Sequence, residues 1–392
     1  MQSLRDCALD TVHGFLAETM STSRRVTLFD IADALGISTG TVHRALHDHP
    51  GVNAQTRMRV LQISKNLGYR PNVAARLLSQ KKQFRISVNT LKGTTSFWDE
   101  VRGGIQEEAE ALGTHSADIE FRTFPSLGEG EEEAFEAAIA AKSDGVILFP
   151  SRPSSVRTWM RRASRSKTPI VCVSTDAPHS NRLAVVSVDT MASGSLAADL
   201  MGRFLNHKGK VAVTLSALAI TEHAEKLTAF EKTLRALHPE ISLLDPIEDH
   251  DVESEAYDKC GKLFAAHPDL AGIYVTTEAS MPVIQAAKDA DLLDRLTIIT
   301  TDLFPALIEQ IRAGKVSATI HQRPYMQGRL AFRILQEFLI HGRYPASPVT
   351  LAPHLVMAGN LDFFLEKQAS DGSNVRAAAS DLPSDFTYNN YD

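Results

Sequence analysis

From residue 85 onward, short runs rich in β-branched residues alternate with longer runs of helical composition, and this alternation limits the possible folds most. Strands are expected at 85–89, 119–124, 145–149, 170–174, 185–188, 211–215, 272–276, 297–301 and 318–322. Helices are expected between most of them, including 99–112, 131–142, 190–204, 222–237 and 255–266. Such alternation implies right-handed βαβ units and parallel sheets covered on both faces. Nine or more strands are many for one sheet, so we expect two α/β lobes with a ligand cleft beyond the carboxyl ends of their strands.

The charge of the chain is strongly polarised. Residues 24–85 carry eleven Lys or Arg and three acidic residues, a net charge of +8, whereas the whole chain carries −6. The other 330 residues therefore carry −14. A basic segment of domain length attached to an acidic body is the electrostatic pattern expected of a nucleic-acid-binding head. On charge alone, a solvated basic surface without a partner remains the alternative.

Two short helices joined by a tight turn are predicted inside the basic segment. Thr27 and Asp30 form an S/T-x-x-acid start that can satisfy the free amides of a helix N-terminus. Gly36 can adopt the left-handed conformation that ends this first helix. Ser38 can then cap a second helix that runs to about residue 46. This pattern is typical of a helix-turn-helix.

The second helix of a helix-turn-helix enters the DNA major groove with its N-terminal residues over base edges. Here those residues are Thr39, Gly40 and Thr41. Arg44, one turn further on, is the best candidate to pair with guanine, because its guanidinium fork matches two acceptors on that base. A third helix is expected at 53–67, and a Pro-started basic segment at 69–79 lies outside the three-helix unit.

Residues 26–79 resemble the DNA-binding head of the lactose repressor (LacI/GalR) family. The matching runs, in order, are V-T-L-x-D-I-A, G-I-S-x-x-T-V-x-R-A-L, T-R-x-x-V, L-G-Y-x-P-N and A-R-x-L. The resemblance implies that residues 71–82 form a hinge helix and linker. It also implies that Leu78, with Ala75 beside it, wedges a base step open when two subunits dock in the minor groove. The alternative for Leu78 is a packing leucine in a linker helix.

The DNA contacts expected from this resemblance and from helix-turn-helix geometry span the head and the hinge. They are Thr27, Ser38, Thr39, Gly40, Thr41, His43, Arg44, Asn53, Tyr69, Asn72, Ala75 and Leu78. His43 stands where the family usually has a small hydroxyl residue, and Gly40 removes a side chain from a position that often reads a base. These departures put the preferred DNA sequence in question. His43, His47 and His49 lie close enough in sequence for a metal site, but no metal is expected because DNA already accounts for this face.

Residues of about 83–365 resemble the periplasmic-binding-protein-like effector domain of the same family. The resemblance implies a first lobe of about 83–177 and 302–338, and a second lobe of about 178–301 and 339–365. The effector contacts that it implies are Phe97, Trp98, Asp176, Asp189, Lys226, Glu278, Asp302 and Gln322. An aromatic ring, carboxylates and a cation together suit a sugar or another polyol. Lys226 replaces an arginine of the family and Glu278 a neutral amide, which puts the best-known sugars of the family in question.

Several of these effector candidates have a structural alternative. Asp189 could cap the helix expected at 190–204, Trp98 could belong to the core of a lobe, and Lys226 could lie on the surface. Asp302 is the strongest candidate for a contact with the effector.

Motifs for other chemistry are absent from the sequence. It contains no GxxxxGK[ST], HExxH, GxSxG or glycine-rich dinucleotide turn, so neither an enzyme nor a cofactor is expected. The cysteines, Cys7, Cys172 and Cys260, are far apart, which argues against a disulfide framework and favours a reducing cytoplasm. No apolar run approaches the roughly 20 residues that cross a bilayer, and residues 1–20 have no signal-peptide core.

The sequence as a whole predicts a ligand-responsive transcriptional regulator, expected to be a repressor that binds operator DNA as a homodimer. Residues 1–23 are read as an N-terminal extension, with either translation from Met20 or a loosely held helix at 9–20, and residues 24–70 as the head. Residues 366–392, rich in Ser, Asp, Asn and Ala, are expected to be a disordered tail. The alternatives are a solute-binding or sensor protein that never contacts DNA, and the same regulator with a nucleobase-like effector.

Overall fold

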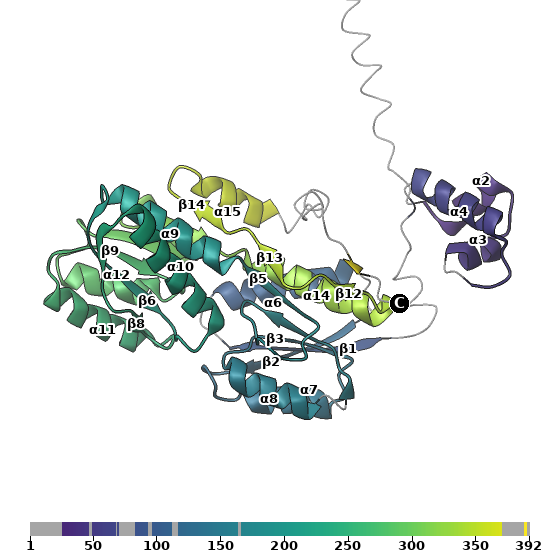
Figure 1. The fold of residues 1–392 in the computed structure, drawn as a ribbon, viewed down its shortest axis with the longest axis horizontal. Coiled ribbons are helices and arrows are strands. Elements are labelled where there is room, and N and C mark those ends of the chain that lie inside the picture. The colour runs from purple at the N-terminus through teal and green to yellow at the C-terminus, as the bar shows by residue number, and fades with distance from the viewer. Residues whose placement is uncertain are drawn as a thin grey trace, which may run out of the picture. The chain divides into compact units, whose positions relative to one another are not determined.

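The computed structural model describes residues 26–46, 49–67, 69, 83–92, 96–111, 117–163, 166–370 and 388–389. The chain forms two compact units, Met1–Lys81 and Lys82–Asp392, and each is described by itself (Figure 1). The expected N-terminal extension at 1–23 and hinge at 71–82 lie outside the described residues. None of the described helices is both long and apolar enough to cross a membrane.

The described residues of the first unit form three short helices, as the sequence predicts. They are α2 (Leu28–Leu35), α3 (Thr39–Leu46) and α4 (Ala54–Asn66). Thr27 and Asp30 form the predicted capping box at the start of α2, and Gly36 ends that helix with a φ of 64°. Ser38 accepts a hydrogen bond from the backbone amide of Thr41, so it caps α3 as expected. The helices bury a small apolar core of Ile31, Ala32, Val42, Ala45 and Val60.

Lobe 1 of the second unit is built on a six-stranded sheet in which every pair of neighbours is parallel, in the order β13-β5-β4-β3-β1-β2. Its strands are β1 (Phe84–Leu91), β2 (Ala117–Phe124), β3 (Gly145–Leu148), β4 (Ile170–Val173), β5 (Ala184–Val188) and β13 (Val349–Leu351). One face is covered by α6 (Ser96–Ala111) and α14 (Pro324–His341), and the other by α7 (Glu131–Ala140) and α8 (Pro153–Ala163) (Figure 1).

Lobe 2 is built on a second sheet with the path β14-β11-β10-β9-β6-β7, and β8 also pairs with β6. Its strands are β6 (Lys208–Leu215), β7 (Glu240–Leu243), β8 (Ile247–Glu248), β9 (Leu270–Val275), β10 (Thr297–Thr301), β11 (Ala318–His321) and β14 (His354–Val356). The helices α9 (Thr190–Phe204) and α10 (Thr221–Leu237) pack on one face. The other face carries α11 (Glu253–Ala266), α12 (Ser280–Asp289), α13 (Pro305–Arg312) and α15 (Leu361–Ser370).

The chain passes between the lobes three times, at the junctions β5–α9, β11–α14 and β13–β14. All strands of the two sheets run parallel except β14, which is antiparallel to β11. The carboxyl ends of the parallel strands therefore meet where the lobes face each other, which is the position expected for a ligand site in this class of fold. The alternation of strands and helices and the two-lobed α/β architecture are confirmed.

The expected division of the chain between the lobes was wrong in three segments. The strand β5 pairs with β4 and therefore belongs to the first sheet, although residues from 178 onward were expected in the second lobe. The elements α13 and β11 belong to lobe 2, because β11 pairs with β10. The strand β13 belongs to lobe 1, because it pairs with β5. Each error has the same cause: a strand's sheet is decided by its partner strand, and that partner can be far away in sequence.

The C-terminal region differs in part from the disordered tail expected at 366–392. The helix α15 continues to Ser370. Farther on, the strand β15 (Tyr388–Asn389) pairs in antiparallel fashion with β12 (Tyr344–Pro345). The tail boundary at 366 was therefore too early, because the helix extends beyond Leu365, the last large apolar residue of its sequence pattern.

Candidate functional site

The first turn of α3 is presented to solvent. Thr39, Gly40, His43 and Arg44 are exposed, while Val42 and Ala45 on the opposite side are buried in the three-helix core. The buried pair fixes the rotation of α3 about its axis, so the exposed residues share one outward face. Such a face, with hydroxyls first and an arginine one turn later, is suited to the edges of bases in a major groove.

The other predicted DNA contacts in the head have structural roles as well. Asn53 accepts a hydrogen bond from the backbone amide of Thr56 at 2.7 Å and thereby caps α4. Tyr69 packs against the three-helix core. The ring of His43 stacks on that of His49 with the centroids 5.9 Å apart. Three predicted DNA contacts, Asn72, Ala75 and Leu78, lie outside the described residues, as does His47, which was considered only for a metal site.

In the second unit, a chain of hydrogen bonds joins buried polar residues at the edge where the lobes meet. The Lys226 ammonium, which is fully buried, donates to Glu222 Oε1 at 2.5 Å, to Gln322 Oε1 at 2.7 Å and to the Thr276 carbonyl oxygen at 3.4 Å. Asp302 accepts from the Gln322 backbone amide at 2.7 Å and from its side-chain amide at 2.6 Å. The structure therefore brings together three of the predicted effector residues, Lys226, Asp302 and Gln322.

Lobe 1 contacts this network through two short segments. Ser174 Oγ, which follows β4, donates to Glu222 Oε2 at 3.1 Å, and the Glu222 amide donates to Thr175 Oγ1 at 3.2 Å. At the other end of the cleft, Glu278 Oε1 accepts from Ser96 Oγ at 2.9 Å and from the Phe97 amide at 3.0 Å. In both contacts a carboxylate of lobe 2 accepts from a serine hydroxyl of lobe 1, and Glu278 also accepts from a lobe-1 amide.

The predicted aromatic pair lies inside lobe 1. Phe97 and Trp98 are 7% and 6% exposed, and the Trp98 ring packs against Phe149 at a centroid distance of 4.7 Å. Phe97 meets Trp98 edge to face at 4.9 Å. The rings therefore form lobe-core packing, which is the alternative to stacking on a sugar.

Two predicted aspartates lie apart from the Lys226 network. Asp189 accepts a hydrogen bond from the Ala192 amide at 2.8 Å and caps α9, which is its structural alternative. The Asp189 amide also donates to the Leu351 carbonyl oxygen at 2.8 Å and so ties two of the interlobe junctions together. Asp176 accepts from the Arg182 guanidinium at 2.6 Å.

Burial changes the protonation of the cleft residues. It raises the pKa of Asp302 to about 6, although the two hydrogen bonds from Gln322 work in the opposite direction. It raises the pKa of Glu100 to about 8, and the charges of Asp302 and Glu278 add to the effect. Burial lowers the pKa of His223 to about 4 and that of His321 to about 3, so both imidazoles are neutral near pH 7. Burial disfavours the charge on Lys226, but the nearby Glu222 charge outweighs this and raises the Lys226 pKa.

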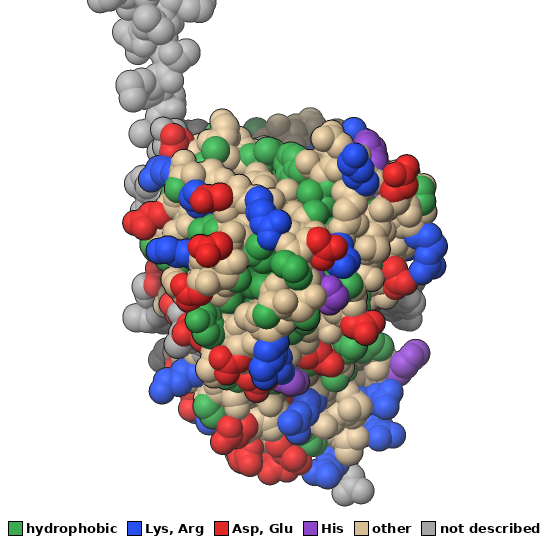
Figure 2. Space-filling view, turned by 90° about the vertical axis from the view of Figure 1, so that its left-hand side faces the viewer, with side chains coloured by type: hydrophobic (Ala, Val, Ile, Leu, Met, Phe, Trp, Pro, Cys, Tyr) green, Lys and Arg blue, Asp and Glu red, His purple; other side chains and the backbone are tan. Residues whose placement is uncertain are grey.

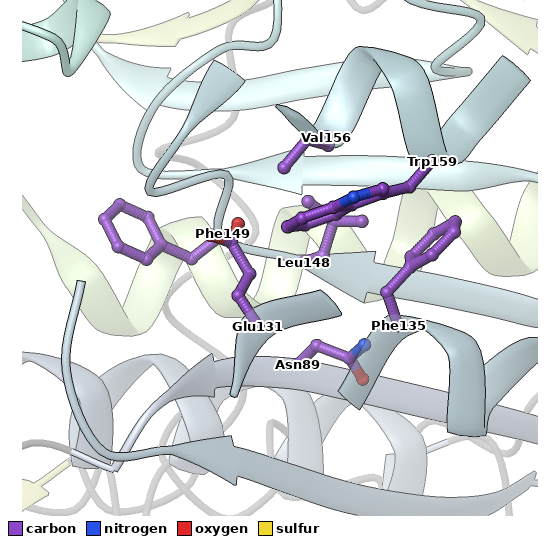
Figure 3. Close-up of a pocket in the computed structure, with 7 residues that line it drawn as sticks. All are labelled: Asn89, Glu131, Phe135, Leu148, Phe149, Val156 and Trp159. Atoms are coloured by element: carbon purple, nitrogen blue, oxygen red, sulfur yellow. The ribbon is translucent and has the colours of Figure 1, made fainter. Parts of the chain in front are cut away.

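A small cavity lies behind the cleft in lobe 1 (Figure 3). Its volume is about 10 Å³, and it is lined by Asn89, Glu131, Phe135, Leu148, Phe149, Val156 and Trp159. Figure 3 shows the Phe149 ring turned away from the rings of Phe135 and Trp159. A volume of this size holds at most about one water molecule, so the cavity is unsuited to an effector.

A wider groove of about 620 Å³ lies between α11 and the last turns of α12, on the side away from the strand carboxyl ends. At this end of the molecule, basic and acidic side chains are interspersed over the surface (Figure 2). The described residues contain no group of three or more His, Cys, Asp or Glu placed to hold a metal ion.

Several residues of the network were missed by sequence reasoning. Glu222 and Ser96 contact the predicted residues Lys226 and Glu278, and Ser174 contacts Glu222, but none of the three belongs to a recognised motif. Glu222 carried the clearest signal, because it lies four residues before Lys226 on a predicted helix, where an acid and a lysine can pair. The serines gave no signal, since their partners lie 48 and 182 residues away.

Family models match both units of the chain. A model described as bacterial regulatory proteins of the lacI family matches residues 27–72. A model described as a periplasmic binding protein domain matches residues 86–343. The second match covers more than half of the chain, and the two together span the head and both lobes.

Individual proteins agree with these matches. Catabolite control protein A of Staphylococcus aureus is 26% identical over 341 residues, which cover 84% of this chain and 97% of that protein. The HTH-type transcriptional regulator AglR of Rhizobium meliloti is 36% identical over 143 residues, covering 35% of this chain and 39% of that protein. Among solved structures, GanP, a glucose-galactose binding protein from Geobacillus stearothermophilus, has a TM-score of 0.67 at 22% identity and covers 71% of this chain and 99% of its own.

Proposed function

Because this chain belongs to the lacI family of bacterial regulatory proteins, it is a DNA-binding transcriptional regulator, and we propose that it is a repressor switched by a polyol effector. The family consists of regulators rather than enzymes. The observation that carries the proposal is the outward face of α3, where Thr39, Gly40 and Arg44 are exposed on a helix held in place by the head core. The proposal places the protein in the cytoplasm, together with the DNA that it reads.

The proposed operator contact has two parts. The exposed face of α3 reads base edges, with Arg44 donating two hydrogen bonds to a guanine. The hinge at 71–82, including Asn72, Ala75 and Leu78, docks beside the hinge of a second subunit in the minor groove. A homodimer therefore reads a pseudo-palindromic operator whose symmetry matches its own.

The proposed effector binds where the lobes meet. A carboxylate at Asp302, the amide of Gln322 and the ammonium of Lys226 are polar groups held in fixed positions by their mutual hydrogen bonds. Such groups suit the hydroxyls of a sugar. The name of GanP, a glucose-galactose binding protein with the same two-lobed fold, supports sugars as the first class to test. A nucleobase-like effector is the second class.

The effector switches DNA binding by changing how the two lobes close on each other, and hence whether two hinge segments can fold together. An effector can drive such a switch only if it binds the two states with different affinity. Coupling of this kind is typically worth about 1–3 kcal/mol.

Selection of bound genomic fragments by the purified protein tests the proposal. We expect a pseudo-palindromic sequence to be enriched, and we expect the Arg44→Ala protein to lose the preference at one base pair of each half-site. Recovery of no preferred sequence by the wild-type protein would count against a sequence-specific repressor. The genes beside the enriched sites then select the sugars and nucleobases for a thermal-shift screen.

A further inference from the structure

Two glutamates of lobe 2 bridge to lobe 1, and we propose that Glu222 and Glu278 act as a latch that holds the two lobes together. The regulatory half of this inference rests on the proposed function, whereas the latch itself is a property of the two lobes. Glu278 lies two residues before the start of α12, and Glu222 is the second residue of α10. Both side chains cross from the carboxyl edge of the second sheet to the first lobe.

Glu278 binds the start of a lobe-1 helix. Its Oε1 accepts from the Phe97 amide at 3.0 Å and from Ser96 Oγ at 2.9 Å, and these are the first two residues of α6. The amides of a first helical turn have no partner within the helix, so a carboxylate from outside satisfies one of them. The negative charge is also favoured there by the helix dipole. Ser96 Oγ lies 3.3 Å from the Leu303 carbonyl oxygen of lobe 2 as well.

Glu222 makes the second bridge, and its orientation is fixed by Lys226. One carboxylate oxygen accepts from the Lys226 ammonium at 2.5 Å, while the other accepts from Ser174 Oγ of lobe 1 at 3.1 Å. The Lys226 ammonium has three N–H groups and three oxygen acceptors, from Glu222, Gln322 and Thr276. Its donors are therefore already used inside the protein.

Because these donors are already hydrogen-bonded within the protein, an effector cannot bind to them directly. An effector that used Lys226, Ser96 or the Phe97 amide would have to displace a glutamate or amide oxygen that already occupies that donor. Effector binding is therefore an exchange, in which the ligand replaces the latch rather than filling a ready site. The strength of the latch therefore sets how much effector is needed to separate the lobes.

Amide hydrogen exchange of the full-length protein tests the latch directly. In Glu278→Ala we expect the amides at 96–98 to exchange about tenfold faster, the change that corresponds to losing one charge-assisted hydrogen bond. We also expect a larger radius of gyration by small-angle X-ray scattering. Glu278→Gln should lie between wild type and Glu278→Ala, because its Oε1 can accept the same two bonds but carries no negative charge. Glu231→Gln is the matched control, since it removes a carboxylate paired with Arg235 on the exposed face of α10.

A second variant distinguishes loss of the latch from a folding defect. Ser96→Ala removes one donor from lobe 1 without altering lobe 2, and it should change exchange and scattering in the same direction as Glu278→Ala. If both variants melt cooperatively and match the wild type in exchange and radius of gyration, the latch does not exist.

Operator binding, measured in parallel by fluorescence anisotropy, separates the two proposals. A change of at least about threefold in operator affinity in Glu278→Ala, beyond the change in Glu231→Gln, supports regulation by the latch. Open lobes with unchanged affinity would overturn that regulation. A wild-type protein that binds no DNA sequence would overturn the proposed repressor, while exchange at 96–98 would still decide the latch.

Discussion

Arg44 is the residue on which sequence reading by the head depends most. It is exposed on α3, one turn beyond the helix start, and its side chain can offer two parallel donors to a guanine. The small residues before it, Thr39 and Gly40, leave room for the helix to approach the bases closely. The specificity of the head is thus concentrated in a long, charged side chain.

Arg44→Ala should relax the base preference at one position in each half-site and cost about 1–3 kcal/mol for each guanine that is no longer bound. Anisotropy titrations with the operator and with single-base variants would measure both effects. Arg59→Ala, which removes the same charge from an exposed position on α4, should weaken binding to all DNA sequences alike. An unchanged ranking of base variants in Arg44→Ala would show that another residue reads this base.

Glu100 makes the stability of the folded protein depend on pH, and its raised pKa sets the direction of that dependence. Burial raises its pKa from 4.5 to about 8, and its side chain is 24% exposed. Between those two pH values the folded protein holds a proton that the unfolded chain has released. The contribution of Glu100 to stability is therefore full below about pH 4.5 and is lost as the pH rises through about 8.

The melting temperature should accordingly fall from pH 5 to pH 8, and Glu100→Gln should reduce this fall. Asp302 contributes with the same sign, because its pKa is also raised, so the comparison between the variant and the wild type is the informative one. Glu110→Gln, which alters an exposed carboxylate on the same helix, is the control. Equal slopes for wild type and Glu100→Gln would contradict the assignment.

At this scale, local roles could be predicted from sequence and distant partners could not. The caps formed by Thr27, Ser38 and Asn53 involve residues three positions away, within reach of a short pattern. Lys226 was expected to face an effector, but its ammonium is bound by Gln322, 96 residues away. No sequence pattern in the helix that carries Lys226 indicates that Gln322 is its partner.

At the scale of elements, the packing of α6 on α14 depends on two glycines at their crossing. A Cβ added to Gly104 would lie 2.0 Å from the Tyr325 carbonyl oxygen, and one added to Gly328 would lie 2.0 Å from that of Val101. Both clashes are with backbone atoms, which cannot move aside as a flexible side chain can. The two helices therefore approach as closely as their backbones allow.

Gly104→Ala should destabilise the protein by about 1–3 kcal/mol, the usual cost of overpacking. Its neighbour provides a matched control, because Gly103 is exposed and an added Cβ there would meet nothing within 4 Å. Gly103→Ala should be neutral or stabilising by up to about 1 kcal/mol, since alanine favours a helix interior over glycine. Denaturant unfolding of the pair would measure the difference, and equal stabilities would contradict a backbone-limited crossing.

The sequence was a good guide to the elements and a poorer guide to how they pair. Alternating runs predicted nine strands to within a few residues, because burial on both faces requires continuous apolar segments, but the short strands β7, β8, β13 and β14 were not predicted. The assignment of β5, β11 and β13 to the lobes was wrong, because pairing with a strand far away in the sequence produces no local sequence pattern. The two-lobed architecture could be predicted, but the exact points of crossing between lobes could not.

At the scale of the whole molecule, the net charge of +8 on residues 24–85 and −14 elsewhere separates the part that attracts phosphate from the part that repels it. An acidic effector domain limits non-specific contact of the lobes with the duplex. Affinity for DNA should therefore come almost wholly from the basic segment.

Operator affinity should fall steeply as salt rises, by about 10³-fold or more between 50 and 200 mM if 6–10 phosphates are neutralised. Titrations at four or five salt concentrations would give the slope. Arg59→Ala should lower the slope by about one per subunit for every phosphate that the variant no longer neutralises, whereas Arg44→Ala, which removes a base contact, should change the slope less. A flat dependence would mean that the basic segment is not the DNA-binding surface.

The pairing of β13 with β5 has a consequence for how the protein is made. Lobe 1 begins at residue 84, yet its sheet is completed by Val349–Leu351. The edge of β5 therefore stays open on the ribosome while the residues from 189 to 348, including nearly all of lobe 2, are synthesised. A nascent chain exposes an unpaired strand during that whole interval. Chains that end before residue 349 lack β13, so they should fold in lower yield. The need for chaperones should likewise depend on the late synthesis of β13.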